Sequence, residues 1–271
     1  ESNAIMVWLD VTGSMGSVVD IIHKKLPTLM GILTRKAYIP DPQILFGAIG
    51  DATTDKAPLQ VGQFESGDEM EGDLSNFLME GNGGGQFPPT ESYELAAYVG
   101  ARKTSIDCFE KRGKKGYCFI IGDERPYTEV KKSIITKLIG SELEADISTK
   151  EIFKELQEKY VTFFILPRGA SHGGQFTELR GVWGQYIDPQ HILALEDPNA
   201  AAELIATQIR LYEGSTDMDA AAKDLEEHGV SKALVSVVRS SVSKAYEGGS
   251  LARVAAGTLP TSGPSTPTKR L

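Results

Sequence analysis

The chain has 271 residues, of which 41% are hydrophobic and 24% are charged, a composition that is typical of a globular protein and excludes a fibre or a wholly disordered chain. Its 28 basic and 37 acidic residues give a net charge of −9, which argues against nucleic acid or an anionic lipid surface as the main partner. No apolar run reaches the roughly 20 residues that a membrane span needs, so we expect no membrane span.

Short, almost continuous apolar runs predict strands that are buried on both faces of a sheet. The runs are 5–9, 44–49, 117–121, 161–166 and 192–195. Between them, apolar residues recur at helical spacing, namely Val18, Ile21, Ile22, Leu26 and Leu29 after the first run, and Leu95, Ala96, Val99 and Ile106 before the third. This alternation predicts an α/β protein with a doubly wound, mostly parallel sheet and helices on both faces, similar to a Rossmann fold.

Two further segments bound the predicted sheet. The apolar residues within 59–64 follow the second run after a connection too short for a helical crossover, which predicts one antiparallel strand at the edge of the sheet. Near the other end, Asp197 and Pro198 predict the capped start of a helix. We expect this helix to end the α/β domain near Gly214.

The composition changes after Gly214. Residues 217–227 and 230–246 have helical patterns, and His228 and Gly229 between them form a helix-stop signal, so we expect a helical hairpin. Residues 248–271 are rich in Pro, Ser, Thr and Gly, which predicts a flexible tail. The sequence therefore predicts three parts: an α/β domain at 1–214, a helical hairpin at 215–247 and a tail at 248–271.

The end of the first predicted strand carries three oxygen-bearing side chains at alternate positions, Asp10, Thr12 and Ser14. In an open parallel sheet the carboxyl ends of the strands form the binding crevice. A carboxylate and two hydroxyls are hard ligands of the kind that Mg²⁺ accepts, so this loop is a candidate metal site. The alternative is that Thr12 and Ser14 cap the following helix while Asp10 accepts hydrogen bonds from loop amides.

Acidic residues also follow two other predicted strands. Asp51 and Asp123 each come directly after a glycine at the end of an apolar run. Carboxylates that converge on one sheet edge repel each other unless a cation lies between them, which favours a metal at this edge. A glycine-rich loop within 81–93 adds the hydroxyl of Thr90 before a helix, although a loop of this composition alone indicates only flexibility.

The Asp10-Val-Thr12-Gly-Ser14 motif, followed by an antiparallel hairpin, the glycine-rich loop and a strand that ends before Asp123, resembles a von Willebrand factor A domain with a metal-ion-dependent adhesion site. The resemblance covers residues 4–214 and is greatest to the intracellular bacterial type. It implies that Thr12 and Ser14 bind the metal directly, that Thr90 joins from the second loop, and that Asp10 and Asp123 hold coordinated waters or contact the ion.

Two positions depart from the family pattern. The family places its second-loop threonine soon after the glycines, whereas Gln86 and three further residues precede Thr90 here, so Gln86 is an alternative ligand. Asp51 does not belong to the standard set, and we expect it to line the rim of the site.

The resemblance implies a protein-binding module in which an acidic side chain of a partner completes the coordination of the metal, within a multiprotein complex that includes an AAA+ ATPase or another enzyme. We expect Mg²⁺, with Mn²⁺ second and Ca²⁺ less favoured. Cys108 and Cys118 are too few for a disulfide framework, and the first residues lack a secretory signal, so we expect a cytoplasmic location.

Two alternatives remain at this point. A metal-dependent hydrolase or phosphotransferase of the haloacid dehalogenase type would use Asp10 as its nucleophile, but that chemistry needs a second aspartate where this chain has Thr12. The other alternative is a scaffold of the same fold that binds no metal and contacts its partners through the C-terminal segment.

Overall fold

The computed structural model describes residues 2–35, 38–67, 69–79, 88–214 and 217–246. Its main feature is a six-stranded sheet in the order β10-β9-β5-β1-β2-β3. The strands are β1 (Asn3–Asp10), β2 (Pro42–Ile49), β3 (Leu59–Val61), β5 (Gly116–Ile121), β9 (Tyr160–Pro167) and β10 (Ile192–Leu195). All neighbouring strands are parallel except β3, which runs antiparallel to β2 at the edge. The predicted α/β fold with one antiparallel edge strand is confirmed.

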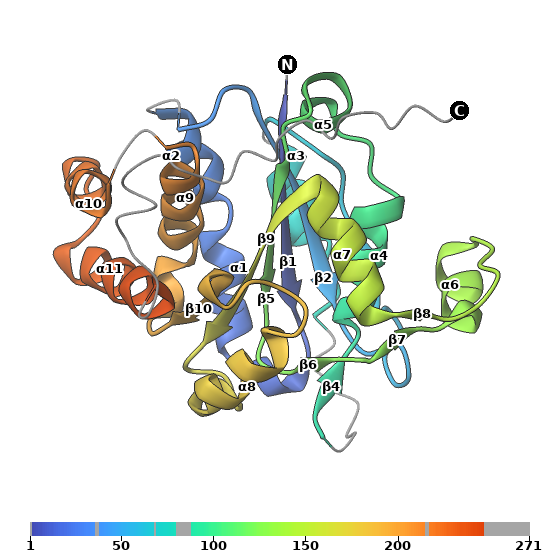
Figure 1. The fold of residues 1–271 in the computed structure, drawn as a ribbon. Helices are drawn as coiled ribbons and strands as arrows, with labels where there is room; N and C mark the ends of the chain where they lie inside the picture. The colour runs from blue at the N-terminus through green and yellow to red at the C-terminus, as the bar shows by residue number, and fades with distance from the viewer. Residues whose placement is uncertain (1, 36–37, 68, 80–87, 215–216, 247–271) are drawn as a thin grey trace, which may run out of the picture.

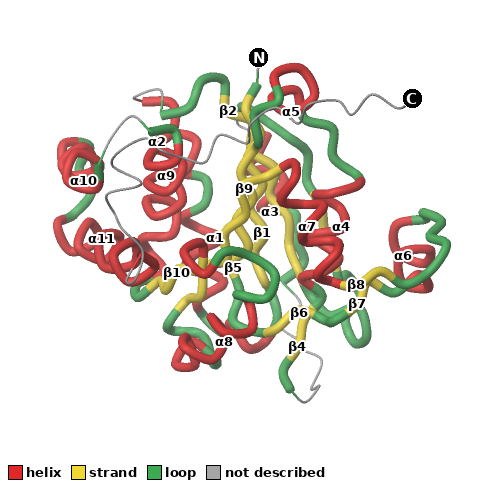
Figure 2. Tube along the Cα trace, in the orientation of Figure 1, coloured by secondary structure: helices red, strands yellow, loops and turns green. Residues whose placement is uncertain are grey.

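Helices cover both faces of this sheet (Figure 1). One side carries α1 (Val18–Lys25), α2 (Thr28–Arg35), α9 (Ala201–Tyr212), α10 (Met218–Glu227) and α11 (Lys232–Tyr246). The remaining helices are α3 (Glu69–Ser75), α4 (Tyr93–Arg102), α5 (Asp107–Arg112), α6 (Lys132–Ile139), α7 (Thr149–Lys159) and α8 (Phe176–Trp183). In Figure 2 the strands of the sheet lie together between α9 and α7, as a doubly wound arrangement requires.

The alternation of side chains along β1 explains the two layers of the core. Ile5, Val7 and Leu9 pack into one hydrophobic cluster, which also contains apolar residues of α1, α2, α9 and α11. Met6 and Trp8 point to the opposite face, into a second cluster with α4 and α7. Since every residue of β1 is buried, the strand is apolar almost throughout, which is the pattern of a central parallel strand.

Three local features differ from the sequence prediction. The apolar residues from Val18 to Leu29 form two helices, not one, because Pro27 has no N–H group to continue the hydrogen-bond ladder of α1. Ile106 lies outside α4 and immediately precedes α5. Two short strand pairs were not predicted: β4 (Thr90–Glu91) with β6 (Arg125–Pro126), and β7 (Glu129–Val130) with β8 (Ile147–Ser148).

The C-terminal helices form where they were predicted. Asp197 caps a short 3-10 helix with Pro198 in its first position, and α9 follows directly. Asp217 caps α10, and its side chain accepts a hydrogen bond from the Ala220 amide. Helix α11 adds Val235, Val238 and Val242 to the cluster around α9. The predicted tail at 248–271 lies outside the described residues, and the division into three parts stays a prediction.

Candidate functional site

The candidate site lies at the carboxyl ends of β1 and β5, where the order of the strands along the chain reverses. The chain passes from β1 outward to β2 and β3 and then returns to the other side of β1 with β5. Ligand crevices in open α/β sheets form at such a reversal. Asp10 is the last residue of β1, and Asp123 lies two residues beyond the end of β5. Both carboxylates are fully buried.

A chain of hydrogen bonds connects these two aspartates through two hydroxyl groups. The Thr12 hydroxyl donates to Asp10 Oδ1 over 2.5 Å, and the Thr12 amide donates to the same oxygen over 2.9 Å. The hydroxyl oxygens of Thr12 and Ser14 are 3.2 Å apart, and the Ser14 hydroxyl donates to Asp123 Oδ1 over 2.7 Å. Residues from two strand ends, 109 positions apart between Ser14 and Asp123, therefore form one connected group.

Helix capping does not account for these hydroxyls. Thr12 occupies the position before the 3-10 helix Gly13–Met15, but its side chain makes no capping hydrogen bond. Helix α1 begins after Ser17, whose side chain does not cap it either. The alternative to a metal site was that Thr12 and Ser14 cap the helix while Asp10 accepts hydrogen bonds from loop amides. Only its second part is present, since Asp10 accepts a hydrogen bond from the Thr12 amide.

The second oxygen of Asp10 is bound by a tyrosine on α4. The Tyr93 hydroxyl donates to Asp10 Oδ2, and the same hydroxyl accepts a hydrogen bond from the Glu124 amide at 3.3 Å. This approach depends on Gly122, because a Cβ at that position would lie 2.3 Å from the Tyr93 hydroxyl oxygen. Burial and the neighbouring Asp10 raise the pKa of Tyr93 well above its ordinary value, so the phenol keeps its proton.

Two further carboxylates lie beside this group. Glu91 is on β4 and Glu124 follows Asp123, and the pairing of Thr90 with Arg125 brings the two segments together. Both glutamates are buried, at 1% and 7% exposure, and one oxygen of Glu91, Oε2, has no hydrogen-bond partner in the described structure. This acidic surrounding was not predicted. Its only traces in the sequence are the polar pair Thr90-Glu91 ahead of α4 and the adjacent acids Asp123-Glu124.

The protonation of these acids reflects burial and mutual repulsion. Burial, together with the charge of Asp123, raises the pKa of Asp10 to about 7. Burial and the neighbouring carboxylates, Asp10 first among them, raise the pKa of Glu91 to about 10. Burial and then Asp123 raise the pKa of Glu124 to about 7. Within the described residues, no Lys or Arg side chain forms an ion pair with Asp10, Asp123 or Glu91, and hydroxyl and amide groups bind the two aspartates.

The loop after β9 closes one side of the site. The His172 amide donates to Asp123 Oδ2 over 3.0 Å, and the Ser171 amide donates to the carbonyl oxygen of Ser14 over 2.9 Å. The His172 ring also lies 3.5 Å from a carboxylate oxygen of Glu124. The residues of this loop show no ligand spacing in the sequence.

The less certain site residues fall in different places. Thr90 lies on β4 next to the site, but its hydroxyl donates to the carbonyl oxygen of Pro88 over 2.7 Å. Gln86 lies outside the described residues. Asp51 follows β2 and forms a turn of its own, accepting hydrogen bonds from the Thr53 amide and hydroxyl at 2.8 Å and from the Tyr127 hydroxyl at 3.0 Å.

A conventional metal cluster is not present in the described part of the chain, which holds no group of three or more His, Cys, Asp or Glu side chains that could bind a metal ion. The predicted set is of another kind, since two of its members, Thr12 and Ser14, are hydroxyls. The two buried carboxylates and two hydroxyls fit a hard divalent cation by donor type. Asp10, Thr12, Ser14 and Asp123 are the residues that could hold one.

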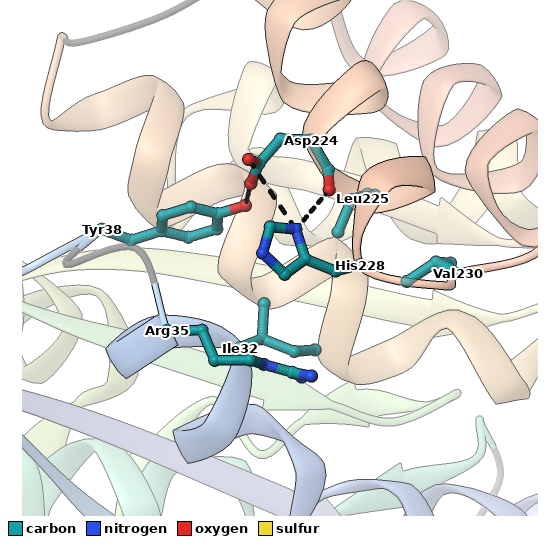
Figure 3. Close-up of a pocket in the computed structure, with 7 residues that line it drawn as sticks. All are labelled: Ile32, Arg35, Tyr38, Asp224, Leu225, His228 and Val230. Atoms are coloured by element: carbon teal, nitrogen blue, oxygen red, sulfur yellow. Dashed lines mark hydrogen bonds and ion pairs between the residues drawn. The ribbon is translucent and has the colours of Figure 1, made fainter.

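A second concave region lies between α2 and α10, away from the strand ends (Figure 3). There the buried Asp224 carboxylate is 2.9 Å from Nη1 of Arg210 and accepts a hydrogen bond from the Tyr38 hydroxyl. His228 lies between Tyr38 and Arg35 in this view, with Nδ1 3.8 Å from Asp224 Oδ1. The carboxylate in this region therefore has a cationic partner from the chain itself.

Comparisons with known proteins reveal the fold and little else. No family model and no curated protein matches the chain. The pilus adhesin SpaC from Lactobacillus rhamnosus GG, in its open conformation, is similar with a TM-score of 0.54 and 9% identity over 78% of this chain and 30% of the adhesin. Proximal thread matrix protein 1 from the mussel byssus is similar with a TM-score of 0.51 and 10% identity, over 77% of this chain and 47% of that protein.

This chain thus spans less than half the length of either structure, and identities of 10% or below concern the fold alone. In the described part of the chain, no helix combines the length and the apolar character needed to cross a bilayer.

Proposed function

We propose that the chain is a protein-binding module of the von Willebrand factor A type that engages its partner through a divalent cation. The observation that supports this most directly is the connected group of Asp10, Thr12, Ser14 and Asp123 at the reversal point of the sheet. Four oxygen-bearing side chains meet there, and the two acids among them are bound by hydroxyl and amide groups of the chain.

The contacts of the four residues suggest a separate role for the hydroxyls and for the carboxylates. Thr12 and Ser14 supply neutral oxygens, which leave the charge of a bound cation largely uncompensated. Asp10 is fixed by the Thr12 amide and the Tyr93 hydroxyl, and Asp123 is fixed by the His172 amide, so both carboxylates are oriented before any ligand arrives. When bound, the cation supplies a Lewis-acidic position that a carboxylate of the partner can occupy.

The donor set and the partner chemistry follow from hardness and charge. Oxygen ligands alone favour Mg²⁺ first and Mn²⁺ next, and so small a set favours Ca²⁺ less, since Ca²⁺ takes 6–8 oxygen ligands. An Asp or Glu side chain of a partner protein is the ligand that completes the site. We place this interaction in a multiprotein complex of the cytoplasm, where the free and buried thiols of Cys108 and Cys118 would stay reduced.

Neither alternative function has an observation that favours it to the same extent. A hydrolase that used Asp10 as nucleophile would need an acid at position 12, where this chain has Thr12, whose hydroxyl donates a hydrogen bond to Asp10. A scaffold without metal would leave Asp10, Asp123, Glu91 and Glu124 in one buried group, with no Lys or Arg ion pair within the described residues to offset their repulsion.

The test is thermal unfolding of the chain as Mg²⁺ is added, with Mn²⁺ and Ca²⁺ as comparisons. A ligand that binds only the folded state raises its stability, by about 2.7 kcal/mol at a hundredfold excess over Kd. We expect this rise in the wild type and not in Asp10→Ala or Ser14→Ala. A pulldown from lysate with and without EDTA then shows whether a partner depends on the metal.

The chain contains a matched control for these variants. Thr53 binds Asp51 through its amide and hydroxyl, as Thr12 binds Asp10, but this turn is not connected to Asp123. Thr53→Ala should therefore keep the full response to Mg²⁺. No response in the wild type would refute metal binding and leave the scaffold that binds no metal.

A further inference from the structure

We propose that the partner segment carries a second acidic residue, which binds in a cleft next to the metal site. This inference rests on the proposed function and names the partner chemistry more closely. The cleft has a volume of about 280 Å³ and lies between the ends of β9 and β10, the start of α8 and the last turn of α11. We call it the Arg168 cleft, after the cation that lines it together with Phe176, Thr177, Glu196 and Lys244.

One loop joins the cleft to the candidate metal site. The His172 amide holds Asp123, and Gly174, two positions further along, already lines the cleft. Two residues of chain span at most about 7 Å, so the cleft begins within that distance of the residue that contacts the site. The near edge of the cleft therefore lies close to the loop that holds Asp123, and we take the second acidic residue to lie about two or three residues from the first in the partner segment.

The charges of the cleft favour a negative side chain there. Lys244 Nζ lies 2.7 Å from Glu196 Oε1, and Arg168 Nε lies 3.7 Å from Glu196 Oε2, so two cations share one carboxylate. The charged side chains that line the cleft sum to +1 in a chain whose net charge is −9. The first turn of α8, with Phe176 and Thr177, adds the positive end of a helix dipole.

The two cations remain accessible and have donors to offer. Their side chains are 34% and 43% exposed, for Arg168 and Lys244 respectively. Arg168 carries five N–H donors and Lys244 three, and their contacts within the described residues are with Glu196 and, for Arg168, the carbonyl oxygen of Gly173 at 2.6 Å. An incoming carboxylate can therefore bind both groups while Glu196 keeps its place.

The test uses immobilised synthetic peptides that share one fixed Asp in a Gly/Ser background. The residue three positions away from this Asp is Asp, Ser or Lys. One series of three peptides carries this variable position before the fixed Asp, and a second series carries it after. In Mg²⁺ we expect the peptide with two Asp residues to bind the wild-type chain about two- to fivefold more tightly than the Ser peptide, the size of an exposed charge pair. The Lys peptide should bind more weakly than the Ser peptide.

Lys244 provides the variant and its own helix provides the control. Lys244→Ala should remove most of the preference for the second Asp, and Lys244→Glu should shift the preference toward the Lys peptide. Arg239→Ala, on the same helix, removes an exposed cation that pairs with Asp219 outside the cleft, and it should leave the preference unchanged. The side chain of Arg239 is 42% exposed, nearly the same as that of Lys244.

Equal Mg²⁺-dependent affinity of the wild type for the Asp and Ser peptides would overturn this inference and leave the proposed function standing. If no peptide shows binding that is lost when EDTA is added, metal-bridged binding is refuted, and the second acidic contact is refuted with it.

Discussion

Two regions of this molecule that contain buried carboxylates bind them with different partners. At the helix pair α2 and α10, Asp224 is bound by Arg210 and Tyr38. At the ends of β1 and β5, Asp10 and Asp123 are bound by hydroxyls and amides, with further acids close by. An acid paired with a cation of its own chain serves stability, whereas acids assembled without one leave a place for a cation from solution.

A similar contrast distinguishes Asp10 from Asp51, two aspartates at the ends of adjacent strands. Asp10 is the last residue of β1 and Asp51 lies two residues beyond β2. Each accepts hydrogen bonds from the amide and hydroxyl of the threonine two residues later. Among the described residues, the Asp10 turn continues through Ser14 to Asp123, an acid beyond the end of β5, and the Asp51 turn does not. An aspartate at a strand end is therefore insufficient as a signal of a metal site, and the connection between strands is the informative feature.

The largest effect is expected where the chain supplies its own cation. Asp224→Ala leaves the Arg210 guanidinium and the Tyr38 hydroxyl without their carboxylate, in a region where Asp224 is 5% exposed. Breaking a buried ion pair by removing one partner costs about 3–5 kcal/mol. Urea unfolding should show this loss, while Arg239→Ala, which breaks an exposed pair, should cost less than about 1 kcal/mol. Equal losses in the two variants would show that Asp224 is not a structural acid.

The next largest effect is expected at the Tyr93 hydroxyl, the neutral group that donates a hydrogen bond to Asp10. In Gly122→Ala the new Cβ would lie 2.3 Å from the Tyr93 hydroxyl oxygen and displace the phenol from Asp10. Overpacking of this kind costs about 1–3 kcal/mol, and we expect the upper end because the Tyr93 ring is fully buried. The variant should also bind Mg²⁺ more weakly, as a titration followed by thermal unfolding would reveal.

Gly181→Ala is the control, because no atom lies within 4 Å of its added Cβ on α8. Alanine is the better helix former, so this variant should be unchanged or slightly more stable. A Gly122→Ala chain with normal stability and normal metal response would mean that Tyr93 plays no part in positioning Asp10.

The sequence is sufficient to predict the sheet because its parallel strands are almost entirely buried and hence almost uniformly apolar. The same reasoning places Asp10, Thr12 and Ser14 at the end of β1 and Asp123 beyond β5, and it leads to the edge at which the structure joins them. This part of the site follows from topology alone, since parallel strands deliver their carboxyl ends to one edge.

The surroundings of that edge could not be predicted, because they depend on contacts without periodicity. Glu91 enters the site through a two-residue strand, and His172 through the backbone amide of a loop. The orientation of the Thr90 hydroxyl toward Pro88 is likewise a local choice that spacing cannot reveal. Such features are set by the closing of loops over a formed sheet, after the hydrophobic pattern has determined the strands.

Replacing Asp by Asn should change the stability of the chain in opposite directions in the two regions, at Asp10 and at Asp224. Without metal, Asp10→Asn should stabilise the chain, because it removes a buried charge that faces Asp123 while an amide can keep the contacts with Thr12 and Tyr93. The folded pKa of Asp10 is raised from 3.8 to about 7, so the protonated form stabilises the wild type fully below pH 4, and this contribution is lost as the pH rises to 7. The gain in Asp10→Asn should therefore be on the order of 2 kcal/mol at pH 8 and absent near pH 4.

Thermal unfolding in EDTA at both pH values measures this gain, with Asp224→Asn expected to destabilise at each pH. Asp51→Asn should give no gain at pH 8, because the carboxylate of Asp51 accepts hydrogen bonds from three side-chain hydroxyls, those of Thr53, Thr54 and Tyr127. A loss of stability in Asp10→Asn at pH 8 would contradict the view that Asp10 repels its neighbours in the absence of a cation.

The smallest effect concerns Glu94, a buried acid on α4 that lies next to the site without belonging to it. Its Oε2 has no hydrogen-bond partner in the described structure, and burial raises its pKa from 4.5 to about 8. Because the folded state holds this proton more tightly than the unfolded state, stability from Glu94 is complete below pH 4.5 and is lost as the pH rises to 8. Glu94→Gln keeps the shape of the side chain without its charge, so it should be more stable than the wild type at pH 8 and similar to it at pH 4. The gain should be smaller than that of Asp10→Asn, because the amide group that replaces Oε2 has no hydrogen-bond partner in the described structure. Glu158→Gln, at an exposed position on α7, should run parallel to the wild type over this range. If the stability of Glu94→Gln also changed with pH as that of the wild type does, Glu94 would be ionised in the folded chain. The region around Asp10 and Asp123 would then have to accommodate one more negative charge.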